Sequence, residues 1–349
     1  MSKLRVAVLF GGRSGEHEVS IRSAASVVAA LDRSRYEVVP VAITKSGEWL
    51  GAKASANLLP LAECGPLSTE IDPHFSLQPG ASSGFDLVFP VLHGTFGEDG
   101  TMQGYIELAG LPYVGSGVLG SACGMDKDVM KRLFRERGLP TADHICLLRG
   151  AHRDRVEQIE KRFDYPLFVK PANLGSSVGI SRAADREELL AALDLAAEFD
   201  RKIIVESEVA GREIECSVLG NDLPEASLPG EIVTQQGFYD YESKYVTDDA
   251  ELAIPADLTD EQVVEVQRVA VEAFLAVECC GLARVDLFLE NGTGRFLLNE
   301  VNTMPGFTSI SMYPKLWEAS GLPFSALLDR LIELAIERHE QRRQTRFEL

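Results

Sequence analysis

Apolar residues in the first third of the chain form short continuous runs that are separated by polar, glycine-containing turns. Such runs predict buried strands at 4–10, 36–44, 85–92 and 111–114. Helical spacing of apolar positions predicts helices at about 18–31 and 104–109. Strands that alternate with helices form parallel sheets, and ligands bind beyond the carboxyl ends of such strands. The loops 11–16 and 93–99 follow two of these ends, so we expect a site there.

The middle of the chain has the pattern of a compact α+β unit. Its predicted helices are 127–137, 153–163 and 186–198. Its predicted strands are 165–171, 202–206 and 213–219. One further strand is predicted after the helix break at 138–140. A loop of small residues, 172–179, follows the strand 165–171.

The last third combines a polar, aromatic-rich segment with a hairpin and two amphipathic helices. These elements are predicted at 237–249, 259–277, 283–301 and 324–340. The hairpin turn, Asn291-Gly-Thr-Gly294, is a strong turn signal. We therefore predict a mixed α/β and α+β fold in three units. They are an N-terminal α/β substrate-binding domain (1–122), a central module (123–220) and a C-terminal module with a metal site (221–349).

Composition narrows the class of protein. The chain has 349 residues, of which 45% are hydrophobic and 25% charged, as in globular proteins. A formal net charge of −19 argues against nucleic acid as a partner, so any anionic ligand must be held by a few local cations. The N-terminal apolar run is only one strand long, so we expect no signal peptide or membrane span and a cytoplasmic location. Six cysteines without a Cys-x-x-Cys pair indicate reduced thiols.

Two common nucleotide-binding motifs do not account for the sequence. No Gly-Lys dipeptide occurs, so a conventional phosphate loop is absent. The segment 115–120, Gly-Ser-Gly-Val-Leu-Gly, matches the dinucleotide fingerprint. It follows three earlier strands, however, and no acidic residue closes a second strand about 20 positions later. A linker turn between domains is the better interpretation.

The C-terminal hairpin carries the more specific signal. Asp286 lies on one arm, and Glu300 and Asn302, two apart and therefore on one face, lie on the other. Hard oxygen ligands on strands suit Mg²⁺, which nucleotide phosphates then complete. A simple register would pair Asp286 with Asn299, so a bulge is needed to bring Glu300 opposite. The alternative is a pair of ordinary exposed strand ends.

Two lysines are candidates for binding a triphosphate. Lys170 ends the apolar strand Leu-Phe-Val-Lys and precedes the small-residue loop 175–179, while Lys127 opens a predicted helix. Small residues let backbone N–H groups approach phosphate, and the lysines supply the local charge that an acidic protein needs. Taken alone, each of the two residues is equally well interpreted as an ordinary surface lysine.

Taken together, seven segments resemble the D-alanine–D-alanine ligases of the ATP-grasp superfamily over nearly the whole chain. They are GGRSGEHEVS (11–20), HGTFGEDGTMQG (93–104), GSGVLGSACGMDK (115–127), VKPANLGSSVG (169–179), FYDYESKY (238–245), RVD (284–286) and NEVNTMPGFTSISMYPKL (299–316). The resemblance implies a pre-ATP-grasp domain followed by a two-module ATP-grasp fold.

The resemblance also implies where ATP binds, between the central and C-terminal modules. The adenine would contact Glu206 and Val209, the ribose Glu213, and the γ-phosphate Lys244. The implied nucleotide-binding positions are Lys127, Lys170, Ser177, Glu206, Val209, Glu213, Phe238, Lys244 and Asn299. Two Mg²⁺ or Mn²⁺ ions would be held by Asp286, Glu300 and Asn302.

The implied reaction activates one D-alanine as an acyl phosphate, which a second D-alanine attacks, giving a dipeptide for peptidoglycan. Arg284 and the Gly306 N–H would meet the oxyanion, and Glu16 would accept the ammonium of the first D-alanine. The implied catalytic residues are Glu16, Ser176, Tyr245, Arg284 and Gly306. The implied substrate-binding residues are His93, Glu98, Ser311 and Met312. Family members commonly form homodimers through the N-terminal region.

Three alternatives to this function are considered. A relative that adds D-lactate or D-serine is disfavoured by Tyr245 and by the absence of a cation at Ser311 and Met312. Another ATP-grasp carboxylate–amine ligase is disfavoured by the N-terminal motifs around Glu16 and His93. A nucleotide-binding module without catalysis would be expected to lack a metal ligand or phosphate lysine, and none is missing.

Overall fold

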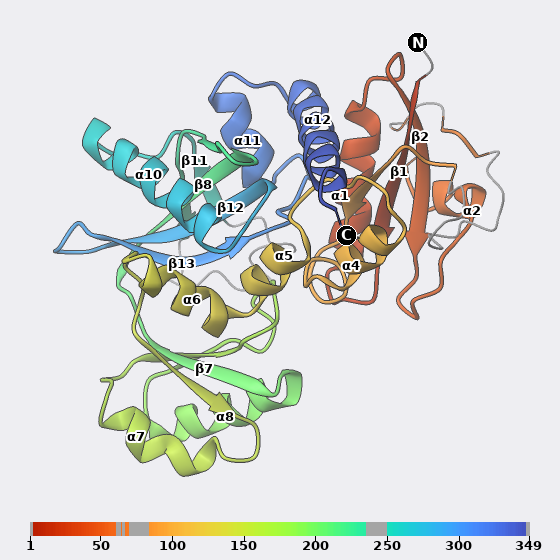
Figure 1. The fold of residues 1–349 in the computed structure, drawn as a ribbon. Helices are drawn as coiled ribbons and strands as arrows, with labels where there is room; N and C mark the ends of the chain where they lie inside the picture. The colour runs from red at the N-terminus through yellow and green to blue at the C-terminus, as the bar shows by residue number, and fades with distance from the viewer. Residues whose placement is uncertain (1–2, 61–63, 65–66, 70–83, 235–249, 347–349) are drawn as a thin grey trace.

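The computed structural model describes residues 3–60, 64, 67–69, 84–234 and 250–346. Over these residues the strands form three sheets, which lie around one junction (Figure 1). The first sheet is parallel, in the order β2-β1-β3, as the alternation of strands and helices predicts. Its strands are β1 (Leu4–Gly11), β2 (Tyr36–Ile43) and β3 (Leu87–Val91). Its helices are α1 (His17–Ala30), α2 (Ala52–Ala56) and α4 (Thr101–Leu108).

Residues 111–120 differ from the sequence prediction. The strand expected at 111–114 is reduced to one bridge, between Val88 and Tyr113. The segment 115–120 is not wholly a linker turn, because helix α5 (Val118–Met125) begins inside it. An added Cβ on Gly120 would lie 2.2 Å from the carbonyl oxygen of Glu278, so this glycine is needed for close packing.

A second sheet of four antiparallel strands, β4-β7-β5-β6, forms the central module. Its strands are β4 (His144–Leu148), β5 (Leu167–Pro171), β6 (Ser181–Ala183) and β7 (Lys202–Ser207). The helix predicted at 153–163 is shorter, a 3₁₀ turn (Arg153–Arg155) followed by α7 (Val156–Glu160). Together with α8 (Arg186–Phe199), these elements enclose a hydrophobic core that is separate from the other cores.

The third sheet follows the path β11-β10-β8-β12-β13, with β9 paired to β8. Its strands are β8 (Gly211–Gly220), β9 (Glu225–Ala226), β10 (Gly230–Thr234), β11 (Ala250–Ala253), β12 (Gly281–Glu290) and β13 (Phe296–Asn302). Its helices are α6 (Lys127–Glu136), α10 (Asp260–Ala276), α11 (Met312–Ala319) and α12 (Phe324–Arg343).

Two elements that the sequence groups with the central module pack elsewhere. The strand predicted at 213–219 is β8, which pairs with β10 and β12 of the third sheet. Helix α6 contributes Met130 and Phe134 to the core beneath that same sheet. The reason is that β8 is long and buried from Ile214 to Gly220, so it can serve as an inner strand between two others.

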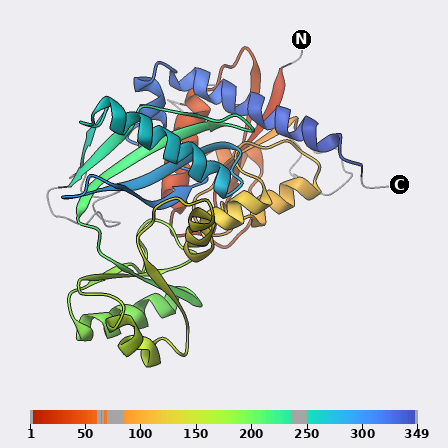
Figure 2. The same cartoon turned by 60° about the vertical axis from the view of Figure 1, so that its left-hand side comes forward.

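Helix α12, the last helix of the chain, lies beside α1 of the first domain (Figures 1 and 2). Its buried leucines, among them Leu327 and Leu331, belong to the same core as Val8 and Phe10 of β1. The first and third sheets therefore share one hydrophobic core, whereas the central module projects from them (Figure 2). Among the described residues, no helix combines the length and apolar character needed to cross a membrane.

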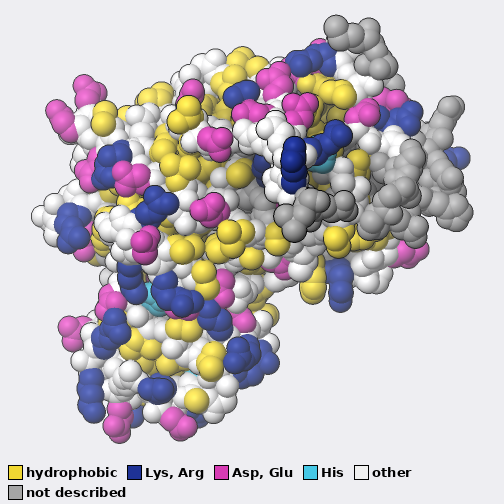
Figure 3. Space-filling model, viewed as in Figure 1, with side chains coloured by type: hydrophobic (Ala, Val, Ile, Leu, Met, Phe, Trp, Pro, Cys, Tyr) yellow, Lys and Arg dark blue, Asp and Glu magenta, His cyan; other side chains and the backbone are white. Residues whose placement is uncertain are grey.

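Charge is unevenly distributed over the face in Figure 3. Lys and Arg side chains gather over the central module at the bottom of that view, although the whole chain is strongly acidic. Local cations are therefore present beside the junction of the modules, as binding of an anionic ligand by this chain requires.

Candidate active site

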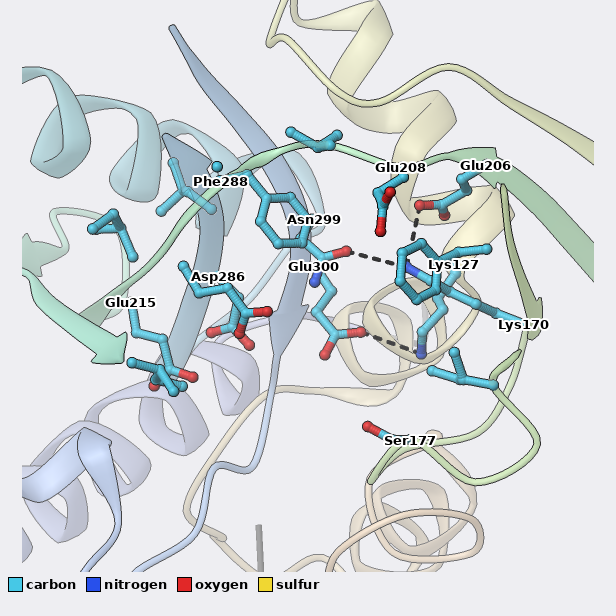
Figure 4. Close-up of a pocket in the computed structure, with 18 of the residues that line it drawn as sticks. Lys127, Lys170, Ser177, Glu206, Glu208, Glu215, Asp286, Phe288, Asn299 and Glu300 are labelled. Carbon is cyan, nitrogen blue, oxygen red and sulfur yellow. Dashed lines mark hydrogen bonds and ion pairs between the residues drawn. The ribbon is translucent and has the colours of Figure 1, made fainter. Parts of the chain in front are cut away.

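A cleft of about 1130 Å³ opens between the central module and the third sheet. Its walls contain nine residues that the sequence assigned to nucleotide or metal. They are Lys127, Lys170, Ser177, Glu206, Val209, Glu213, Asp286, Asn299 and Glu300, and Figure 4 labels all of them except Val209 and Glu213.

The two predicted phosphate lysines enter this cleft from different elements (Figure 4). Lys127 is the first residue of α6, whose N-terminus is capped by the carboxylate of Asp126. Its Nζ donates to the carbonyl of Leu174 at 2.7 Å and lies 3.3 Å from Glu300. Lys170, near the end of β5, places its Nζ 3.2 Å from Glu206. Both ammonium groups thus face the same space and are held by neighbours.

Glu206 lies between two lysines, one of which the sequence analysis missed. Lys131, one turn after Lys127 on α6, places its Nζ 3.4 Å from Glu206 Oε1. Burial by itself would raise the pKa of Glu206, but Lys131 and Lys170 lower it to about 2. Burial lowers the pKa of Lys131, and Glu206 opposes that shift. The spacing of four residues from Lys127 was the available signal, because it places both lysines on one helical face.

The small-residue loop after β5 adopts a backbone conformation that lets neighbouring groups approach it closely. Ser176 and Ser177 both have positive φ, 51° and 59°. The hydroxyl of Ser176 donates to Glu16, which connects the loop to the first domain. Added Cβ atoms on Gly94 and Gly175 would lie 2.7 and 3.1 Å from Glu16 Oε2, so both glycines let their loops close onto this carboxylate.

The hairpin of β12 and β13 contains the predicted bulge. Asp286 pairs with Glu300 and Leu287 with Leu298, so Asn299 is the additional residue. Asn302 Nδ2 donates to Asp286 Oδ2 at 2.9 Å. The expectation that Asp286 and Glu300 come opposite each other is therefore confirmed.

This hairpin fits a divalent cation in its donor chemistry. The described residues hold no group of three or more His, Cys, Asp and Glu side chains placed for a metal, but the third predicted ligand is the amide of Asn302. Asp286 also accepts two hydrogen bonds from Arg284, each of 2.7 Å. Burial would lower the pKa of Arg284, whereas Asp286 and Glu215 raise it well above its ordinary value. The carboxylates therefore attract positive charge to this point.

A second cleft of about 900 Å³ adjoins the first, because Ser176 and Glu300 line both. Its walls contain eight residues assigned to catalysis or to D-alanine. They are Glu16, His93, Glu98, Ser176, Arg284, Gly306, Ser311 and Met312. The first domain, the small-residue loop and the third sheet all contribute to this cleft.

Two ionisable groups in the second cleft have displaced pKa values. Burial lowers the pKa of His93, whose Nδ1 is 3.0 Å from the carbonyl oxygen of Met304, although Glu16 acts in the opposite direction. Burial and the charge of Glu16 raise the pKa of Glu98 to about 8. At neutral pH both groups therefore favour their uncharged forms, which leaves Glu16 as the carboxylate suited to an ammonium group.

Ser311 and Met312, which line this cleft, present no charged group to it. The Ser311 hydroxyl accepts from the Thr308 N–H at 3.0 Å, and Met312 is buried. An added Cβ on Gly306 would lie 2.7 Å from Ser311 Oγ, so only glycine fits there without movement. The remaining predicted residues, Phe238, Lys244 and Tyr245, lie outside the described residues.

Glu215 is a second residue that the sequence analysis missed. It lies on β8 opposite Asp286, lines both clefts, and is 3.0 Å from Arg284 Nε. Alternation along β8 was the available signal, because Glu213 and Glu215 are two apart and share a face of the strand.

Two family models match the chain, "D-ala D-ala ligase N-terminus" over residues 5–116 and "D-ala D-ala ligase C-terminus" over residues 133–333. A D-alanine–D-alanine ligase of Solibacter usitatus is 56% identical over 345 residues, covering 99% of each chain. One of Natranaerobius thermophilus is 50% identical, covering 98% of this chain and 97% of its own.

Two solved structures resemble the whole fold. The D-alanine–D-alanine ligase from Coxiella burnetii has a TM-score of 0.84 at 39% identity, covering 99% of this chain and 97% of its own. The VanG D-Ala:D-Ser ligase from Enterococcus faecalis has a TM-score of 0.84 at 38% identity, covering 96% of this chain and 100% of its own.

Proposed function

The chain belongs to the D-alanine–D-alanine ligase family, and from that premise we propose that ATP binds in the first cleft and two D-alanines bind in the second. As a member of this family it is an ATP-dependent ligase that forms D-alanyl-D-alanine for peptidoglycan. The observation that carries the proposal is that Ser176 and Glu300 line both clefts. A γ-phosphate near these residues would lie beside the carboxylate that it must activate.

The nucleotide is held by its base at one end and by its phosphates at the other. Glu206 and Val209 contact the adenine, and Glu213 contacts the ribose. Lys127 and Lys170 bind the phosphates. This role is supported by their position, because both residues line the cleft. The other residues of this proposed site are Ser177, Phe238, Lys244 and Asn299.

Asp286, Glu300 and Asn302 hold two Mg²⁺ or Mn²⁺ ions when the enzyme is loaded. Their oxygen atoms are the donors that such hard cations prefer, and the hairpin places the first two opposite each other. The metal supplies charge neutralisation to the phosphates during transfer.

The chain's own residues then orient the two amino acids. Glu16 accepts the ammonium group of the first D-alanine, and Ser176 and Tyr245 orient Glu16. The carboxylate of this D-alanine attacks the γ-phosphorus, the bond to ADP breaks, and an acyl phosphate forms. The amine of the second D-alanine attacks the acyl carbon, and phosphate leaves after the amine loses its proton. Arg284 and the Gly306 N–H stabilise the intervening oxyanion.

His93 and Glu98 complete the first subsite, and Ser311 and Met312 contact the second D-alanine. The second subsite distinguishes this function from ligation of D-lactate, which carries no ammonium group. The neutral wall at Ser311 and Met312 neither repels an ammonium group nor offers a charge to a hydroxy acid.

The test is phosphate release from ATP with D-alanine alone, with D-alanine plus D-serine and with D-alanine plus D-lactate, followed by identification of the products. We expect D-alanyl-D-alanine in every mixture, with negligible depsipeptide. Since the attacking amine must be neutral, dipeptide formation should increase from about pH 6 to about pH 9. Substantial D-alanyl-D-serine or D-alanyl-D-lactate would show that the second subsite has been assigned to the wrong substrate.

Three further features are part of the proposal. The units follow the chain as 1–122, 123–220 and 221–349, except that β8 is a strand of the third sheet and α6 contributes to its core. The enzyme works in the cytoplasm, where ATP is present. It forms a homodimer through the first domain, which light scattering of the purified protein can test.

A further inference from the structure

Lys131 is the most deeply buried cation near the proposed nucleotide cleft. Its side chain is 1% exposed, whereas that of Lys170 is 11% exposed. Lys170 and Glu206 line the cleft, but Lys131 lies behind Glu206 and does not reach it. A buried lysine away from a ligand is costly unless a partner compensates its charge.

The Glu206 carboxylate divides its two oxygens between these lysines. Oε1 is 3.4 Å from Lys131 Nζ, and Oε2 is 3.2 Å from Lys170 Nζ. The two contacts are unequal in kind, because Lys170 also donates to Asn299 at 3.5 Å and is placed to bind phosphate. Among the described residues, Lys131 Nζ has no hydrogen-bond acceptor and one ion-pair partner, Glu206. Lys131 is therefore the permanent partner of Glu206, whereas Lys170 is the partner that a bound nucleotide can draw away from Glu206.

The other ionisable groups around this pair do not replace Lys131. His144, on the neighbouring strand β4, donates from Nε2 to Asp128 at 3.1 Å, and burial lowers the pKa of His144. Glu300 attracts Lys131 across the cleft, but it is paired directly with Lys127. Without Lys131, the Glu206 carboxylate would keep only Lys170.

We infer that Lys131 is a positioning residue for purine recognition, which holds the Glu206 carboxylate ionised and turned so that the cleft selects a purine with a 6-amino group. This inference rests on the proposed binding of the adenine beside Glu206. An ionised carboxylate only accepts hydrogen bonds. It therefore favours the 6-amino donor of adenine and disfavours the 6-oxo acceptor of hypoxanthine, whereas a protonated carboxyl group could donate to that oxygen.

The test compares ATP with ITP as the nucleotide for ligation in Lys131→Met, which keeps the length of the side chain and removes its charge. We expect KM for ATP to increase about tenfold or more while kcat at saturating ATP changes less than about threefold. The ratio of kcat/KM for ATP to that for ITP should fall about tenfold or more. Lys131→Arg, which retains the charge, should keep most of the preference. Arg137→Met, at the exposed end of α6, is the matched control.

A purely structural role predicts a different result. Lys131→Met would then melt at a lower temperature but keep the wild-type ATP:ITP ratio, and that outcome would overturn the inference. If Lys131→Met does not fold, Lys131→Gln supplies the same comparison, because the amide is neutral but can still donate to Glu206.

Binding of a non-hydrolysable ATP analogue separates this inference from the proposed function. Weaker binding by Lys170→Met, together with an unchanged ATP:ITP ratio in Lys131→Met, would refute the role of Lys131 and leave the nucleotide cleft standing. Unchanged binding by Lys127→Met, Lys170→Met and Lys131→Met alike would refute the cleft itself.

Discussion

Asp286 is the residue on which the charges of the active site converge. It lies opposite Glu300 in the hairpin and accepts hydrogen bonds from Arg284 and Asn302. We expect Asp286→Asn or Glu300→Gln to lower ligation by about 100-fold or more, because each change removes the charge of a proposed metal ligand. The measurement is phosphate release at saturating ATP and D-alanine over a range of Mg²⁺ concentrations.

Glu225→Gln, an exposed carboxylate on β9, is the control for the loss of one negative charge. All three variants should keep the wild-type circular dichroism spectrum. Near wild-type activity in Asp286→Asn would mean that the metal lies elsewhere.

Glu98 makes the stability of the ligand-free protein depend on pH. Its pKa is raised from an ordinary value of 4.5 to about 8, so the folded state binds a proton that the unfolded state has lost. The contribution of Glu98 is therefore fully present below about pH 4.5 and is lost as pH increases toward 8. Glu98→Gln removes this dependence. Relative to wild type, the variant should gain about 1–3 kcal/mol between pH 5 and pH 8, since the side chain is only partly buried.

Melting temperatures of both proteins at several pH values measure that gain. His93 titrates in both proteins, so its effect largely cancels in the difference. A constant difference between the two melting temperatures across this range would show that Glu98 is ionised in the folded state.

Individual residues of the site could be predicted where their spacing within one strand or helix places them on the same face. Glu300 and Asn302 follow from strand alternation, and both end on the face of Asp286. Lys131 and Glu215 share a face with the predicted residues Lys127 and Glu213, and that spacing was the available signal for them. It does not identify their partners, Glu206 and Arg284, which are distant in the sequence. The roles assigned to the cleft-lining residues remain predictions.

Helix α5 illustrates how closely the elements pack at the junction of the sheets. Gly120 faces the backbone of Glu278, and an added Cβ would come within 2.2 Å of the carbonyl oxygen. We expect Gly120→Ala to destabilise the protein by about 1–3 kcal/mol, because backbone atoms must move. The midpoint of urea unfolding measures the change.

Gly104→Ala in α4 is the matched control. There an added Cβ would meet only Val118, at an ordinary 3.8 Å, so removing a flexible glycine from a helix should stabilise by about 0.5–1 kcal/mol. Equal effects of the two substitutions would mean that helix propensity rather than packing determines stability at both positions.

The elements most easily predicted are those with a uniform environment. The strands β1, β2 and β3 are buried on both faces and read as continuous apolar runs. Helix α5 was missed because its sequence, VLGSACGM, is short, glycine-containing and without a polar face. The assignment of β8 to the central module has another cause, since all its partners, β9, β10 and β12, come after it in the chain, and β12 lies about 70 residues later.

The whole molecule is divided by its cores rather than by its three sheets. Residues of β1, α1 and α12 share one core, whereas β5, β7 and α8 enclose their own. We expect amides of the central module to exchange with solvent through a smaller opening free energy than amides of β1, because the module can open without disturbing the shared core. Hydrogen exchange followed by mass spectrometry measures both.

A non-hydrolysable ATP analogue with Mg²⁺ should slow exchange in β5 and β7, which line the proposed nucleotide cleft, and leave β2 unchanged. Identical opening free energies throughout the chain, with and without the analogue, would mean that the molecule unfolds as one cooperative unit.

The position of α12 has a consequence for biosynthesis. The first sheet is complete once β3 has been translated, yet the leucines that cover its core lie in the last helix of the chain. At about 5–20 residues per second, the ribosome needs about 12–47 s to reach them. During that interval the nascent first domain exposes the apolar surface that α12 will bury, so it is a natural client for chaperones. A premature stop codon shortly before α12 would leave that surface exposed permanently.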